Sequence, residues 1–166
     1  MKAQYRDVWF EKGREIPGSR KSVNLPFKRI SARALIIRRK DGFIIGTLHR
    51  KNGRYALPGG AVEDGESTEQ AVRRELAEEN FTLLSPEWEP KVDVDYFDGY
   101  GELSVWHIII VDNVEIGFSE ENVKSRWVAQ EEDVWYPFMQ ERIILTINRY
   151  LPELCKVKIM VRTIEN

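Results

Sequence analysis

Residues 57–80 constrain the fold of this chain most, because a break in regular structure and a helix start follow each other closely there. Pro58-Gly59-Gly60 interrupts any preceding strand, since proline lacks an N–H donor and glycine adopts conformations closed to other residues. Ser67 is followed three residues later by Gln70, which is the spacing of a capping box. We therefore predict a helix that begins at Ser67 and runs to about Asn80.

Strand-like and helical segments alternate on both sides of this helix. Asp41-Gly42 is a strong hairpin turn between two apolar segments. An amphipathic closing helix is expected after Pro137, from the spacing of its apolar residues. The segments with strand-like composition are residues 31–37, 43–48, 92–96, 103–111, 126–129 and 157–164. Such intermixed elements place the chain in the α/β or α+β class, built in layers.

Length and composition fit a single compact domain. The chain has 166 residues, of which 42% are hydrophobic and 31% are charged, as in ordinary globular proteins. Glycine and proline recur in the first thirty residues. We expect residues 1–29 to form an N-terminal arm or an added strand, and residues 30–166 to form the main domain.

The sequence also bears on where the protein works. No apolar run approaches the ~20 residues that a membrane helix needs, and residues 1–6 are not followed by an apolar signal core. Cys155 is the only cysteine, which is compatible with a reducing cytosol. We expect a cytoplasmic protein without a membrane partner.

The two parts of the chain differ strongly in charge. Residues 1–54 carry 15 Lys/Arg and 4 Asp/Glu, a balance of +11, whereas residues 55–166 carry 10 and 23, a balance of -13. One interpretation is a pair of solvated faces that attract each other. The other is a basic part that holds a polyanionic substrate and an acidic part that holds metal ions. Charge alone leaves both open.

Three glutamates of the predicted helix share one side of it. At about 100° per residue, Glu79 lies about 40° from Glu75 and Glu78 about 60° from it in the other direction. Like charges at this spacing repel one another unless water or cations neutralise them. Hard cations such as Mg²⁺ prefer oxygen ligands and combine carboxylates with substrate phosphates. The helix alone fits either a solvated acidic face or a metal site.

The neighbouring residues complete a longer pattern, which resembles the signature of the Nudix hydrolase family. The matching positions are Gly60, Glu66, Arg74, Glu75, Leu76, Glu78 and Glu79. Phe81 stands where the family usually has glycine, and Thr82 where it usually has an aliphatic residue. Glycine there suits a left-handed helix end, a conformation that Asn80 can adopt one residue earlier.

The resemblance implies a Nudix-like α/β/α sandwich with a mixed β-sheet. It implies a pyrophosphohydrolase of the MutT-like type, which cleaves the diphosphate linkage of a nucleoside diphosphate joined to another moiety. The implied cofactor is Mg²⁺, with Mn²⁺ possible, and the implied partner is a nucleotide-type small molecule. The implied metal ligands are the Gly60 carbonyl, Glu75, Glu78 and Glu79. Glu66 and Arg74 would form an ion pair that orients these ligands.

The expected chemistry is attack of a metal-bound water on phosphorus, with a carboxylate taking the proton. Glu79 and Glu121 are both candidate bases, because Glu79 lies among the ligands and Glu121 precedes the strand at Trp127 by six residues. Glu120 lies next to Glu121 in that region, and Glu102, in a glycine-rich loop, is a third candidate base.

Substrate contacts are expected from the segments that lead to the glycines. Arg33 and Arg50 can bind phosphate as forked donors, and Gly59 allows the backbone to come close to a ligand. His49 is expected at the surface and His107 as a packed strand residue. The aromatic residues that could stack on a base are Trp88, Tyr96, Tyr100 and Trp106.

Two other functions compete with hydrolysis. One is a catalytically altered Nudix-like binding or regulatory domain, and the other is a nucleic-acid-binding module that uses the basic N-terminal half. The latter lacks a recognisable reading motif. The substrate is also open, because residues 96–100 contain tyrosines faintly like those of dinucleoside polyphosphate hydrolases and lack the proline that would favour ADP-ribose. The arm and residues 159–164 could pair with a second subunit, giving a homodimer.

Overall fold

A computed structural model describes residues 2–5, 8–11, 14–15, 29–49, 53–97, 102–118 and 124–150. Side chains at positions 2–15, 29, 90–97 and 102 lie outside this description, as do Cys155 and the strand expected at residues 157–164. In the described part no helix is long and apolar enough to cross a membrane.

The centre of the fold is a mixed sheet with the strand order β12-β5-β4-β10-β9, to which β6 adds on β5 and β7 on β4. Its strands are β4 (Arg29–Arg38), β5 (Ile44–Leu48), β6 (Tyr55–Ala56), β7 (Gly59–Ala61), β9 (Glu87–Phe97), β10 (Glu102–Val111) and β12 (Ser125–Val128). The pair β4–β10 is parallel, and the other pairs are antiparallel. The mixed sheet is therefore as the sequence predicts.

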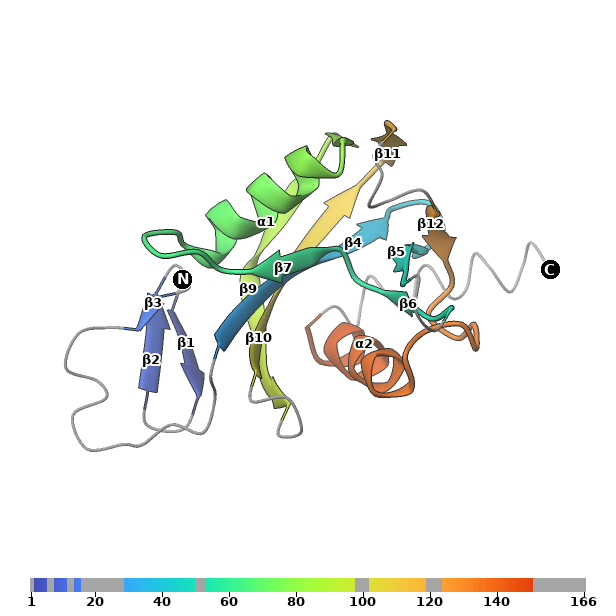
Figure 1. The fold of residues 1–166 in the computed structure, drawn as a ribbon. Helices are drawn as coiled ribbons and strands as arrows, with labels where there is room; N and C mark the ends of the chain where they lie inside the picture. Colours follow the sequence, from blue (N-terminus) through green and yellow to red (C-terminus); the bar gives the residue numbers. More distant parts are fainter. Residues whose placement is uncertain are drawn as a thin grey trace.

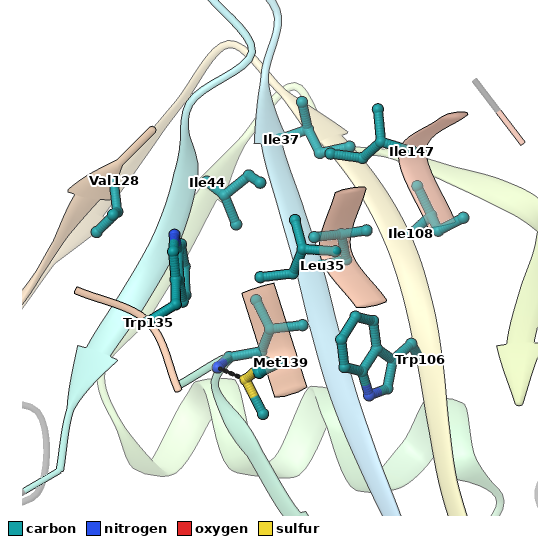
Figure 2. Packing of buried hydrophobic residues seen from close by; sticks show 11 residues of the cluster. Leu35, Ile37, Ile44, Trp106, Ile108, Val128, Trp135, Met139 and Ile147 are labelled. Atoms are coloured by element: carbon teal, nitrogen blue, oxygen red, sulfur yellow. Dashed lines mark hydrogen bonds between the residues drawn. The ribbon is translucent and has the colours of Figure 1, made fainter. Parts of the chain in front are cut away.

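Two helices cover the two sides of this sheet, α1 (Thr68–Glu78) and α2 (Pro137–Tyr150) (Figure 1). Strand β4 alternates between them. Ala32, Ala34 and Ile36 pack with α1, while Leu35 and Ile37 pack with α2. Figure 2 shows the second cluster, in which the backbone N–H of Leu57 donates to the sulfur of Met139 at 3.2 Å. This arrangement is the expected α/β/α sandwich.

The hairpin predicted at Asp41-Gly42 joins β4 to β5. Gly42 has φ +76°, and its N–H donates to the carbonyl of Arg38 at 2.8 Å. The Arg38 guanidinium bonds the Asp41 carboxylate, and its contact holds the pKa of that carboxyl below its usual range despite partial burial, which opposes the shift. The turn chemistry therefore sets the register in which Ile37 faces Ile44.

Helix α1 starts as predicted. The Ser67 hydroxyl accepts from the backbone of Gln70 at 3.0 Å, and the Gln70 amide accepts from the backbone of Ser67 at 2.8 Å. The helix ends at Glu78, two residues earlier than expected, because Asn80 turns left-handed with φ +59°. That turn is the one the sequence suggested for Asn80.

Two smaller sheets complete the described structure. The N-terminal strands β1 (Lys2–Tyr5), β2 (Val8–Glu11) and β3 (Arg14–Glu15) pair antiparallel with one another. Strands β8 (Phe81–Leu84) and β11 (Asn113–Ile116) form a second antiparallel pair directly after α1. The sequence did not predict β6, β7, β8 or β11, which are short and lack a clear alternating pattern.

Candidate active site

Strand β7 brings two glycines against the sheet. Gly59 pairs with Arg33 and Gly60 with Ala32. Gly59 has φ +146°, and a Cβ on it would meet the carbonyl oxygen of Ala32 and lie 2.7 Å from the Cα of Arg33. Only glycine fits there, because the obstacles are backbone atoms that have no room to move. This close approach brings the 59–61 segment into the sheet beside α1.

The second glycine lies against a carboxylate of α1. A Cβ on Gly60 would meet the carboxylate of Glu75, with the carboxyl carbon at 2.8 Å. The missing side chain at Gly60 therefore leaves the space that this carboxylate occupies. The main chain at Gly60 and a helix carboxylate come together in this way from positions fifteen residues apart in the sequence.

Arg74 is the hub of the acidic residues. Its Nε and Nη2 donate to the two oxygens of Glu66 at 2.8 and 3.1 Å, a forked pair. Its Nη1 donates to Glu75 at 3.0 Å and lies 3.5 Å from Glu78, and its Nη2 also donates to the Ala61 carbonyl at 3.1 Å. One guanidinium thus ties β7, the loop before α1 and the middle of α1 together.

The same contacts shift the ionisation of the pair. Hydrogen bonding from Arg74 holds the pKa of Glu66 below its usual range, with desolvation opposing it. Hydrogen bonding to Glu66 likewise raises the pKa of Arg74, again against desolvation. Both side chains therefore stay charged across the range in which enzymes work, so their geometry is held without depending on pH.

The three glutamates of the expected metal site differ in exposure. The side chains of Glu75 and Glu78 are 15% and 55% exposed, whereas Glu79 as a whole is only 7% exposed. Within the described residues, no three Asp, Glu, His or Cys side chains are arranged as a ready metal cage. Glu75 and Glu78 instead turn toward Arg74. Their oxygen chemistry fits a hard cation.

Comparison with known proteins settles the family. The family model of the NUDIX domain matches residues 20–148. The chain belongs to the NUDIX family. Two relatives are nucleoside triphosphatases NudI. The Enterobacter sp. (strain 638) protein is 35% identical over 91 residues, 48% of this chain and 64% of its own length. The Escherichia coli O139:H28 protein is 38% identical over 96 residues, 51% of this chain and 67% of its own length.

Solved structures of Nudix proteins share the fold. An Ap4A hydrolase complex from C. elegans has a TM-score of 0.60 at 19% identity, covering 74% of this chain and 98% of that one. A NUDIX-family hydrolase from Clostridium perfringens has a TM-score of 0.58 at 14% identity, covering 77% and 99%. The Nudix assignment and the α+β fold made from the sequence are thereby confirmed.

The structure describes only some of the residues that the sequence predicts to bind substrate or to act as the base. Arg33 lies on β4 beside Gly59, and its Nη1 donates to the Leu57 carbonyl at 2.9 Å. Arg50, Glu120 and Glu121 lie outside the described residues, as does Tyr100, and so do the side chains of Tyr96 and Glu102. The candidate base Glu121 therefore stays a prediction.

Two of the aromatic residues that were expected to stack on a base already contact other side chains. Trp106 is fully buried, the Arg142 guanidinium lies 4.2 Å from its ring, and its indole N–H donates to Ser104 at 2.9 Å. Trp88 has the Arg73 guanidinium 4.5 Å from its ring and the His107 ring 5.5 Å away. The expectation that Trp106 could stack on a base is wrong for this structure, because neighbours cover the ring completely.

Both histidines lie where the sequence placed them. His49 is exposed, with its ring 6.0 Å from that of Tyr136. His107 is buried in β10 and shares a 2.7 Å hydrogen bond with the Thr68 hydroxyl at the start of α1. Sequence reasoning missed this bond and the carbonyl acceptors of Leu57 and Ala61. Main-chain acceptors have no signature in a sequence, since every residue carries one.

Proposed function

We propose that this chain is a metal-dependent hydrolase that cleaves the diphosphate linkage of a nucleotide. The carrying observation is the Arg74 hub, which fixes Glu66 and Glu75 beside the Gly60 backbone at the middle of α1. A solvated acidic helix face does not require a forked guanidinium contact, a glycine against a carboxylate and a nearly buried Glu79. These three features suit a Nudix pyrophosphohydrolase, since its carboxylates must face a cation in a fixed geometry.

We assign the expected site residues the following roles. Glu75, Glu78, Glu79 and the Gly60 carbonyl would hold Mg²⁺ or Mn²⁺, which would neutralise phosphate oxygens and acidify a water molecule. A carboxylate, Glu79 or Glu121, takes the proton as the water oxygen bonds to phosphorus and the bridging P–O bond breaks. Arg74 keeps Glu75 oriented, and Arg33 donates to a phosphate oxygen of the substrate beside Gly59.

Nucleoside triphosphates are the substrate class that we place first. The support is the name of the relatives at 35% and 38% identity, which are nucleoside triphosphatases. The Ap4A hydrolase likeness is one of fold, at 19% identity. We place the reaction in the cytoplasm, in keeping with the single Cys155.

A panel of nucleotides with and without Mg²⁺ tests this proposal. Nucleoside triphosphates, ADP-ribose, sugar nucleotides and dinucleoside polyphosphates are each incubated with the protein, and the release of the nucleotide product is measured by chromatography. We expect metal-dependent release from at least one class, and a loss of about 100-fold or more in kcat for Glu78→Gln and Glu79→Gln. Glu69→Gln is the matched control, because Glu69 lies on the same helix and pairs with Arg73 instead.

Glu121→Gln separates the two candidate bases. If Glu121 is the base, this variant loses kcat while metal binding stays intact. If it retains full activity, Glu79 is the base. Nucleotide binding without turnover in the wild-type protein would favour the binding-domain alternative and refute the hydrolase.

A further inference from the structure

The end of α1 is built on one unusual residue. Asn80 has φ +59°, and Phe81, the next residue, already begins β8 and is buried. The chain therefore passes from the helix into a strand with a single left-handed residue between them. Asparagine tolerates this conformation better than most residues, and glycine tolerates it best. Sterics at the turn alone would thus favour glycine over asparagine.

The side chain of Asn80 shows why asparagine is there. The side-chain Nδ2 of Asn80 donates to the carbonyl of Phe118, and the backbone carbonyl of Asn80 accepts from the N–H of Gly117 at 2.9 Å. A Cβ on Gly117 would lie 3.0 Å from the Cβ of Asn80 and 3.3 Å from its carbonyl oxygen. Asn80 therefore bonds the segment after β11 with both its backbone and its side chain, in close packing.

This connection begins one residue from the acidic site. The N–H of Glu79 donates to the Glu75 carbonyl at 3.0 Å, and the N–H of Asn80 donates to Ala77 at 3.1 Å. Glu79 is thus held on one side by the last helical bond and on the other by Asn80. A shift of Asn80 would turn the peptide that carries Glu79, since Phe81 is fixed in the core.

We propose that Asn80 is a positioning residue for the hydrolysis, and this inference rests on the proposed function. Its left-handed backbone closes α1, its carboxamide fastens that end to the carbonyl of Phe118, and its backbone carbonyl accepts from Gly117, so that Glu79 keeps its orientation. Asn80 does not touch the reacting atoms. It acts through Glu79, in a place where the Nudix signature ordinarily relies on a glycine one residue later.

Asn80→Gly is the direct test, because glycine keeps the left-handed turn and removes only the carboxamide. We expect kcat to fall roughly tenfold with KM changed less than about twofold, since misplacing a catalytic group affects the chemical step most. Kinetics are measured at a temperature where circular dichroism shows every variant folded. Gly117→Ala is the second variant, since its new methyl group would lie 3.0 Å from the Cβ of Asn80 and push against it. It should lower kcat in the same way.

Ser85→Gly is the matched control. Ser85 is also left-handed, with φ +52°, and follows the other end of β8, where its side chain is exposed. It should leave kcat unchanged. The inference is overturned if Asn80→Gly and Gly117→Ala both keep the kcat of Ser85→Gly in an active enzyme. An inactive wild-type protein would instead overturn the proposed function itself, and the inference with it.

Discussion

Arg74 shows how single residues prepare this site. Its guanidinium is shared among Glu66, Glu75 and Glu78, so the carboxylates are arranged around a cation that the chain itself supplies. Glu66 takes the forked contact and keeps it, whereas the Glu78 contact is long and exposed. Because exposed ion pairs contribute little, Glu78 is free to turn toward a metal at small cost, while Glu66 is not.

Gly60→Ala tests the space beside Glu75. The new methyl group would displace the end of a flexible carboxylate side chain, so the fold should lose no more than about 1 kcal/mol while activity falls at least tenfold. Urea unfolding and initial rates measure the two effects. Gly53→Ala is the control, because Gly53 has φ +68° and open space around it. It should lose about 1 kcal/mol and no activity. Full activity of Gly60→Ala would contradict this role of the glycine.

Among the helices and strands, those whose ends are set by residues close together in the chain could be predicted from the sequence. The start of α1 and the hairpin at Asp41-Gly42 could be predicted because a capping box and a turn signal act within four residues. Strand β7 could not, since Gly59-Gly60-Ala61 has no strand propensity and extends only because β4 pairs with it. For the site, the sequence gives the order of carboxylates along α1 but not their partners. The contact of Gly60 with Glu75 depends on tertiary packing.

His107 on β10 shares a hydrogen bond with Thr68 at the start of α1, and this contact leads to a prediction on how stability depends on pH. Burial lowers the pKa of His107 from 6.5 to about 4, with Glu69 opposing and Arg73 reinforcing the shift. The unfolded chain therefore takes up a proton below pH 6.5 that the folded protein refuses until about pH 4. Stability is fully present at pH 7 and falls by about 3 kcal/mol across that window.

His107→Gln should remove this dependence, since glutamine can still bond the Thr68 hydroxyl but does not titrate. Urea unfolding of both proteins at pH 7, 6, 5 and 4 should show their difference in free energy changing by about 3 kcal/mol. Groups with lowered pKa, such as Glu66 and Asp41, are common to both proteins and cancel. Parallel curves for the two proteins would show that His107 is protonated as readily in the fold as outside it.

The whole molecule separates stability from the acidic site. The two hydrophobic clusters of the described residues lie on opposite sides of one sheet, and β4 and β10 contribute to both. Helix α1 covers one side of that sheet and α2 the other (Figure 1). None of Glu75, Glu78 and Glu79 belongs to either cluster. The carboxylates instead line α1 near β7, supported by Arg74. The fold should therefore form without a metal, and a metal should add stability by neutralising the carboxylates.

Metal addition to the apo protein tests this separation. In EDTA the protein should unfold cooperatively, and Mg²⁺ at about 100 times its Kd should add about 2.7 kcal/mol, which raises the Tm by several degrees. Differential scanning calorimetry measures both states.

Glu79→Gln should fold in EDTA but show a much smaller rise in Tm on adding Mg²⁺, because it removes a ligand and one of the repelling charges. Glu69→Gln should show the full rise in Tm, since the Glu69 carboxylate lies 3.5 Å from Arg73 and is not part of the Arg74 hub. An equal rise in Glu79→Gln would mean that Mg²⁺ binds elsewhere on the chain, and loss of folding in EDTA would mean that the core depends on the metal after all.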